Sequence, residues 1–341
     1  MPAILPPSVL NGAARRCTTV GVDAGLRAYV LRRVGFAVLM LAGVSLILFT
    51  LMRLAPGGPE AVLIGGEFSP AAAAQIRERL GLDRSLPLQY ATWAAAAVRG
   101  DLGRSFKTGD AVAGLILDRI GPTLQLTGGA LLLALVTAIP LGVLAAVRRG
   151  SVWDTLGSAV SLFGVSFPSF WLGIMLILLF SEVFRLLPPS GLSEYGREAD
   201  PVSRLRHAIL PTFTLGAIQM AAFMRFTRSS LLEALRQDYV RTARAKGLSS
   251  GLVVWRHALR NALIPVVTVV GLSLPTLVGG AVLTETVFAW PGIGRLAVGA
   301  VFERDYPVIM GVNMMVAGVV ITANLLTDLA YCLIDPRISY K

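Results

Sequence analysis

The chain has 341 residues, of which 55% are hydrophobic and 15% are charged, and its formal net charge is +11. Soluble domains carry about 25% charged residues, so this composition excludes an ordinary soluble domain and favours an integral membrane protein. The positive charge does not indicate nucleic-acid binding, because many of the Lys and Arg residues lie in short loops beside long apolar stretches.

Six apolar stretches are long enough to cross a bilayer as helices, for which about 20 residues are needed. They cover residues 34–54, 123–147, 157–180, 208–224, 263–287 and 308–334. Pro211 and Gln219 interrupt the fourth stretch, whose helix is expected to continue past Arg225. The sequence therefore predicts an all-α, polytopic integral membrane protein with six transmembrane helices.

The chain divides into three parts around these spans. Residues 1–28 have no periodicity and are expected to form a disordered tail. Residues 29–122 hold the first span and a long loop, and residues 123–338 hold the other five spans. Two short helices are expected in the long loop, one from Ser69 to Leu80 and one from Pro87 to just before Gly100.

The distribution of basic residues predicts the orientation of the chain in the membrane. Lys and Arg are denser in the loops at 148–156 and 225–262 than in those at 181–207 and 288–307. Basic residues in short loops stay on the cytoplasmic side, so both termini are expected to be cytoplasmic.

The basic loop between the fourth and fifth spans is the most informative segment, and it is taken here as residues 229–261. Apolar side chains recur at every fourth position and predict one apolar face on a charged helix. These positions are Leu231, Leu235, Tyr239 and Ala243. Gly247 is placed to end this helix, and Ser249 or Ser250 to begin a second one that runs to about Asn261, before Pro265 opens the fifth span.

Two interpretations of this loop remain open on these grounds. One is a surface that a soluble partner grips. The other is an amphipathic connector that rests on anionic lipid headgroups. The second would suit the basic residues of the loop, which include Arg241, Arg244, Lys246, Arg256 and Arg260.

The same segment resembles the "EAA" loop of bacterial ABC-importer permeases, in which Glu-Ala-Ala is followed by a spaced glycine and by Ile-x-Leu-Pro. Ala243, Gly247 and Leu259 fit that pattern. The departures from it, at Arg241, Thr242, His257 and Arg260, resemble the dipeptide/oligopeptide/nickel branch of the family. Further stretches resemble the same branch: RLAPGGP at 53–59, GDLGRSF at 100–106, ETVFAWPGIGRL at 285–296, ERDYPVIMG at 303–311 and DLAYCLIDPRI at 328–338.

This resemblance implies a type I ABC importer permease fold and the first of two paired permeases, in a bacterial inner membrane. The loop would be a coupling helix that docks on a cytoplasmic ATPase. The docking residues would be Tyr239, Arg241, Ala243, Lys246, Gly247, Leu248 and Leu259. ATP and Mg would be bound by the ATPase, and this chain would need no cofactor of its own.

The implied partners are a second permease subunit forming a heterodimer, one or two cytoplasmic ABC ATPase subunits, an extracytoplasmic solute-binding protein and membrane lipid. The substrate would be a peptide or a related small solute. No nucleic-acid partner is expected.

Three residues of the fifth span are candidates for a gate or pathway: Pro275, Gly279 and Glu285. Pro275 would either kink the helix or be tolerated in a static one. Glu285 lies near the end of the span, where an interfacial position or a local ion pair is the main alternative to a gate.

An enzyme with its own active site is not expected. A phosphate-binding loop of the Walker type requires glycine before lysine, and none of Lys107, Lys246 and Lys341 follows a glycine. His207 and His257 fall on opposite sides of the predicted membrane, so they cannot form a metal pair. The remaining alternative is an ion-coupled secondary transporter, although no span carries a central acidic residue.

Overall fold

The structure is a computed structural model that describes residues 7–54, 74–75, 77–78, 81–197 and 199–334. Within these ranges all regular elements are helical, apart from a single bridge between Arg104 and Ala111. The long helices are α1 (Pro7–Leu54), α5 (Val112–Val147), α8 (Pro201–Ala234), α11 (Leu259–Val287) and α13 (Tyr306–Ile334). The shorter ones are α4 (Leu86–Val98), α6 (Val152–Ser166), α7 (Ser169–Leu176), α9 (Asp238–Ala245), α10 (Ser250–Leu252) and α12 (Ile293–Glu303), with π-helical turns at Ile177–Val183 and Val253–Ala258.

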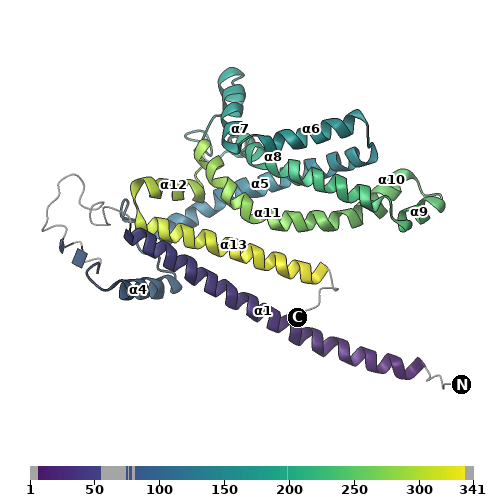
Figure 1. Cartoon of the computed structure of the whole chain (residues 1–341). Coiled ribbons are helices and arrows are strands. Elements are labelled where there is room, and N and C mark those ends of the chain that lie inside the picture. Colours follow the sequence, from purple (N-terminus) through teal and green to yellow (C-terminus); the bar gives the residue numbers. More distant parts are fainter. Residues whose placement is uncertain (1–6, 55–73, 76, 79–80, 198, 335–341) are drawn as a thin grey trace.

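The long helices form an elongated bundle with distinct ends (Figure 1). α5 and α8 make the most extensive contact, and α8 also packs against α6 and α11. α1 lies at the edge of the bundle along α13. α9 and α10 lie at one end, and α4 and α12 lie at the opposite end (Figure 1).

α5 and α8 approach closely because glycine and alanine line their contact. A Cβ added at Gly216 would lie 2.9 Å from the carbonyl oxygen of Ala130, and one at Gly142 would lie 2.8 Å from Thr227 Cβ. Ala134 and Ala138 on α5 are fully buried. In lipid, helix association depends on such close packing because the surroundings are as apolar as the side chains.

The structure confirms the all-helical membrane class and corrects one span. Five helices in the described part of the chain are long and apolar enough to cross a membrane, and Ser169–Val183 forms a shorter apolar stretch. The span predicted at 157–180 is wrong as a single helix, because it breaks between α6 and α7. Phe167 is extended (φ −98°, ψ 135°), as the ring of the following Pro168 requires.

Other boundaries also differ from the sequence prediction. α1 begins at Pro7, so residues 7–28 continue the helix instead of forming a disordered tail, because extending an existing helix is far easier than starting one. α5 begins at Val112 and not at 123, since Pro122 is accommodated inside the helix. α4 confirms the second loop helix. The first one, at 69–80, lies largely outside the described residues, and α12 was not anticipated.

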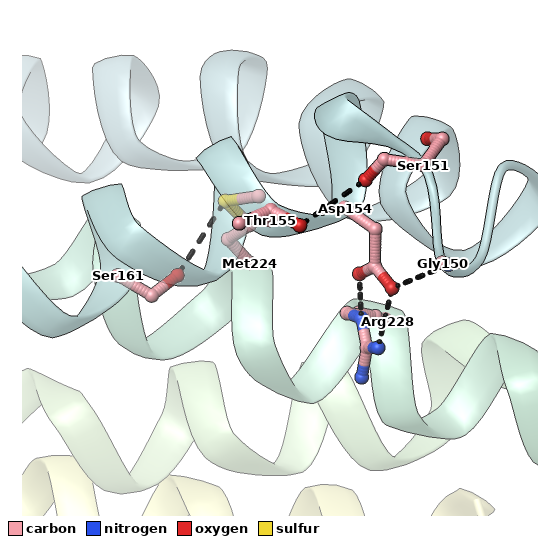
Figure 2. Close-up of polar contacts among 7 residues, drawn as sticks. All are labelled: Gly150, Ser151, Asp154, Thr155, Ser161, Met224 and Arg228. Atoms are coloured by element: carbon pink, nitrogen blue, oxygen red, sulfur yellow. Dashed lines mark hydrogen bonds and ion pairs between the residues drawn. The ribbon is translucent and has the colours of Figure 1, made fainter.

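An ion pair fastens α6 to α8 (Figure 2). The guanidinium of Arg228 donates to both carboxylate oxygens of Asp154, from Nε at 2.6 Å and from an Nη at 3.0 Å. The N–H of Gly150 donates to the same carboxylate at 3.0 Å. These bonds, that of Arg228 first, lower the pKa of Asp154 from 3.8 to about 2, so the carboxylate stays ionised at neutral pH.

A buried carboxylate holds α12 at the opposite end of the bundle. Glu285, at the end of α11, has no exposed surface. The hydroxyl of Thr123 on α5 donates to Glu285 Oε1 at 2.6 Å, and the N–H of Arg295, in the first turn of α12, donates to Oε2 at 3.1 Å. The N–H of Ile293 donates to Thr123 Oγ1 at 2.9 Å. Glu285 and Thr123 therefore accept hydrogen bonds from backbone N–H groups in the first turn of α12, which have no partner within the helix. They also connect α12 to the long helices α11 and α5.

Glycine makes this arrangement possible. A Cβ at Gly294 would lie 2.5 Å from Val282 Cα and 2.9 Å from Glu285 Oε2.

A second buried carboxylate, that of Asp305, lies just before α13. It accepts hydrogen bonds from the hydroxyl of Ser105 and from the N–H of Phe106, the latter at 3.1 Å. Hydrogen bonds to two buried carboxylates thus organise this end of the molecule.

We expect Asp154→Asn to lower the free energy of unfolding by about 1–3 kcal/mol, because it removes charge-assisted hydrogen bonds. Since the native pKa of Asp154 lies below its unfolded value, this contribution is complete above the ordinary range of aspartate and is lost on acidification. The difference in thermal unfolding between variant and parent should be constant from about pH 8 to about pH 5 and shrink below about pH 4.

The matched control for this measurement is Asp238→Asn. Asp238 pairs with Arg241 at 3.5 Å, and its side chain is 94% exposed. Exposed pairs contribute little, so this variant should leave thermal unfolding unchanged. Equal effects of the two substitutions would contradict the importance of the α6–α8 ion pair.

Within α12, Gly294→Ala should lower the free energy of unfolding by about 1–3 kcal/mol because the new methyl group collides with the backbone of α11. Gly299→Ala is the control in the same helix, since nothing lies within 4 Å of a Cβ added there. It should be neutral or stabilising by up to about 1 kcal/mol. Thermal unfolding of the purified protein in detergent measures both, and an equally stable Gly294→Ala protein would contradict the packing described.

Candidate functional site

The basic loop folds into a short helix held at one end of the bundle. α8 ends at Ala234, and a tight turn follows in which the N–H of Gln237 donates to the carbonyl of Ala234 at 3.2 Å. Gln237 then caps α9, which runs from Asp238 to Ala245. The helix predicted without interruption from Ser229 to Gly247 is therefore two helices joined by a bend.

This bend changes which side chains of α9 are buried. Val240 is fully buried and Ala243 is 6% exposed, whereas Tyr239 is 39% exposed. The sequence predicted one apolar face that includes both Leu231 and Tyr239, and this is wrong. The turn at 235–237 separates two helices, so residues on either side of it no longer follow a single helical repeat. Val240 and Ala243 instead point into the protein.

The buried side chains of α9 belong to a hydrophobic cluster shared by four elements of the bundle, which we name the loop cluster. Its buried members are Val143, Ala146, Leu231, Ala234, Val240, Ala243, Val253, Val254, Ala258, Leu259 and Ala262. They come from α5, α8, α9 and the continuous helix that leads into α11. Full burial of a side chain such as valine stabilises by about 1.5–3 kcal/mol, so α9 is anchored to all of these helices.

Gly247 ends α9 as the sequence predicted, and its geometry gives the reason. Its φ is +77°, a left-handed conformation that favours glycine. The N–H of Gly247 donates to the carbonyl of Arg244 at 3.0 Å, and that of Leu248 donates to the carbonyl of Ala243 at 3.4 Å. This pair of bonds is a Schellman motif, and the contact of Leu248 with the loop cluster completes it.

The outward face of α9 is polar and basic. Tyr239, Arg241, Arg244 and Lys246 are exposed. Ala243 was expected to touch a partner directly, but it faces the loop cluster. Leu259, the first residue of α11, is buried in the same cluster. Of the proposed docking residues, the structure leaves Tyr239, Arg241 and Lys246 accessible and buries Ala243 and Leu259.

The segment after Gly247 is one continuous helical run. Ser249 is the residue that precedes it, with its carbonyl accepting from the N–H of Val253 at 3.0 Å. α10, a π-helical stretch at Val253–Ala258 and α11 follow without a break. The predicted end of a second helix at Asn261 and the start of a span at Pro265 are therefore wrong, since Pro265 lies inside α11.

Sequence reasoning missed a basic pocket beside α9. It has a volume of about 380 Å³ and is lined by Arg149, Arg228 and Arg236, together with Glu233 and Gln237. Arg228 is held there by Asp154 at 2.6 Å. Asp154, four residues after Gly150 of the basic turn at 148–150, was the sequence signal for this feature.

The three pathway candidates all lie on α11. Gly279 on α11 is exposed, with nothing within 4 Å of an added Cβ. Glu285 is buried in the α12 contact described above, where its partners are a hydroxyl group and backbone N–H groups. Pro275 lies in α11 on the same helix. Within the described part of the chain, no three His, Cys, Asp or Glu side chains are placed to hold a metal ion.

Comparison with known proteins identifies the family. Residues 138–340 match the model of the binding-protein-dependent transport system inner membrane component. Residues 26–127 match the N-terminal model of the same type of membrane component. The two matches together account for most of the chain, including α9 and the Glu285 contact.

Curated relatives match over almost their whole length. The oligopeptide transport system permease protein AppB of Bacillus subtilis is 40% identical over 316 residues, which is 92% of this chain and 100% of AppB. The dipeptide transport system permease protein DppB of Escherichia coli K12 is 41% identical over 335 residues, covering 92% of this chain and 99% of DppB. The di/tripeptide permease DppB of Pseudomonas aeruginosa is 42% identical, with the same coverage.

Among solved structures, an inward-facing form of the MetNI methionine ABC transporter matches 65% of this chain and 96% of the matched chain, with a TM-score of 0.50 and 20% identity. This likeness supports the fold. Members of the family are transport subunits and not enzymes, and membership favours an ABC importer over an ion-coupled secondary transporter. The chain therefore belongs to the family of binding-protein-dependent transport system inner membrane components, as its sequence motifs predicted.

Proposed function

We propose that this chain imports peptides or a related small solute, and that α9 with the Gly247 bend is its contact with a separate cytoplasmic ATPase. The peptide substrate follows the names of the relatives, which are oligopeptide and dipeptide permeases. The ATPase would bind ATP and Mg, and this chain would transmit its motion.

The observation that carries the proposal is that α9 has one exposed polar face and one buried apolar face. Its outer face offers Tyr239, Arg241 and Lys246 to a partner, while Val240 and Ala243 pack into the loop cluster. Because close-packed side chains are not compressible, a displacement of α9 would be transmitted to α5, α8 and α11 together. ATP-dependent contact at this surface would shift the population between inward-open and outward-open states.

The pocket beside α9 supports the same role. Arg149, Arg228 and Arg236 bring positive charge to a surface next to the α9 cap. An acidic side chain of the ATPase would find charge-assisted hydrogen bonds there. In this arrangement the ion pair of Asp154 with Arg228 keeps one arginine in place while the other two remain available to the partner.

The remaining partners follow from this assembly. Membership of the family implies an ATPase and a substrate-binding protein. We place the chain in the bacterial inner membrane with both termini and α9 cytoplasmic, and the α12 end toward the extracytoplasmic binding protein. A second permease subunit would complete the pathway as a heterodimer. Pro275 and Gly279 stay predictions for its lining.

Cross-linking tests the docking surface directly. In a chain carrying Cys17→Ser and Cys332→Ser, Arg241→Cys should form an adduct with the ATPase subunit in the assembled complex, and the yield should change with bound nucleotide. Ala243→Cys is the control, because Ala243 is 6% exposed and faces the loop cluster. It should give little adduct. Absence of an Arg241→Cys adduct under every nucleotide condition would refute the docking site.

Substitution of Gly247 tests the bend. Nothing lies within 4 Å of a Cβ added there, so space does not select glycine at this position. Only the positive φ does, and it disfavours other residues by roughly 1–2 kcal/mol. Solute uptake should be highest in the parent, lower in Gly247→Asn and lowest in Gly247→Ala. Among residues other than glycine, asparagine tolerates this conformation best. Gly247→Glu should insert into the membrane but lose uptake, because it also adds a negative charge to the docking surface.

The control for this series is Gly251→Ala, at a helical position with nothing within 4 Å of the added Cβ. It should keep parental uptake. Normal ATP-driven uptake by the Gly247→Glu protein, measured with labelled peptide in membranes of verified content, would exclude the coupling role of the bend.

A further inference from the structure

A second pocket lies far from α9, between the last turns of α1 and the start of α4. Its volume is about 480 Å³, which is within the range of small-molecule sites. Leu46, Phe49, Leu82 and Leu86 provide apolar walls. It lies at the edge of the bundle, away from the α5–α8–α11 centre, so it is not part of the proposed coupling surface (Figure 1).

One polar group in this pocket has an unmet hydrogen-bonding requirement. Gln89 lines the pocket and is only 9% exposed. Its Nε2 donates to the carbonyls of Leu82 at 2.9 Å and Arg84 at 2.7 Å, which fixes the orientation of the amide. Its Oε1 is buried and has no hydrogen-bond partner among the described residues. A buried acceptor left unsatisfied costs about 1–3 kcal/mol, so an occupant that donates a hydrogen bond is favoured.

Two guanidinium groups give the same pocket positive charge. Arg53, in the last turn of α1, lies over the ring of Phe49 with its Cζ 5.1 Å from the ring centroid. Arg77 also lines the pocket and pairs with Asp83 at 3.4 Å. Arginine forks match phosphate oxygens, and a guanidinium carries five N–H donors. An occupant with both an anionic group and a donor therefore fits the pocket.

The position of the pocket indicates the class of this occupant. The apolar part of α1 runs from Leu31 to Leu54, so the pocket lies where a spanning helix leaves the hydrocarbon layer. The apolar wall continues into the outer surface of α1, where Leu46, Ile47 and Leu51 are more than half exposed. An acyl chain can follow this surface while its headgroup enters the pocket.

We propose that this pocket binds a phospholipid whose headgroup carries both a phosphate and a primary ammonium. The phosphate lies between Arg53 and Arg77, the ammonium donates to Gln89 Oε1, and the acyl chains run along α1. A zwitterionic headgroup of this kind supplies the missing donor and the matching anion in a single molecule, and the site is independent of the proposed transport role.

Native mass spectrometry of the full-length protein tests this site with two lipids of identical acyl chains. Phosphatidylethanolamine should be retained about tenfold more strongly than phosphatidylcholine, whose quaternary ammonium has no hydrogen to donate. Gln89→Met should remove this preference. Arg53→Gln should reduce retention of both lipids, because both carry the phosphate.

Arg99→Gln is the matched control, since Arg99 follows α4 and does not line the pocket. It should retain both lipids as the parent does. Equal retention of the two lipids by the unaltered protein would overturn the proposal, as would equal losses in Arg53→Gln and Arg99→Gln. Both comparisons remain decisive even if Gln89→Met fails to fold.

Discussion

The close approach of α5 and α8 is the contact on which the rest of the molecule depends. It requires Gly142 and Gly216, because a side chain at either position would meet the facing helix at less than 3 Å. In a bilayer the lipid offers apolar surroundings equal to those of another helix, so only shape and close packing hold the two together. α8 in turn supports α6 through Asp154 and Arg228, packs on α11, and leads directly into α9.

At one end of the molecule, the packed pair of α5 and α8 helps to hold the short helix α9 in place. Eight residues of α9 are too few for a stable isolated helix, so its conformation depends on the loop cluster and on the two turns that bound it. The turn at 235–237 and the left-handed Gly247 set its angle, and Val240 and Ala243 fix its position. The outcome is a polar surface on a close-packed support, as the proposed transmission of a partner's motion would require.

At the other end, segments that are distant in sequence meet through hydrogen bonds to buried carboxylates. Glu285 and Thr123 join α11 to α5 and cap α12, while Asp305 binds the loop at 105–106. The motifs at 100–106, 285–296 and 303–311 therefore make physical sense as contacts of one structure. The 285–296 motif requires glycine at position 294, because a methyl group there would collide with α11.

The sequence by itself determined the membrane class, most of the spans, the family and the glycine stop at Gly247, because length, hydropathy and left-handed geometry are local properties. It did not determine that α6 and α7 are separate, that α9 starts a new helical phase, or that Ala243 faces inward. Nor did it reveal the Asp154–Arg228 pair or the fully buried Glu285. The Asp154–Arg228 and Thr123–Glu285 contacts join residues up to 162 positions apart, and only the packing of helices decides which of these side chains meet.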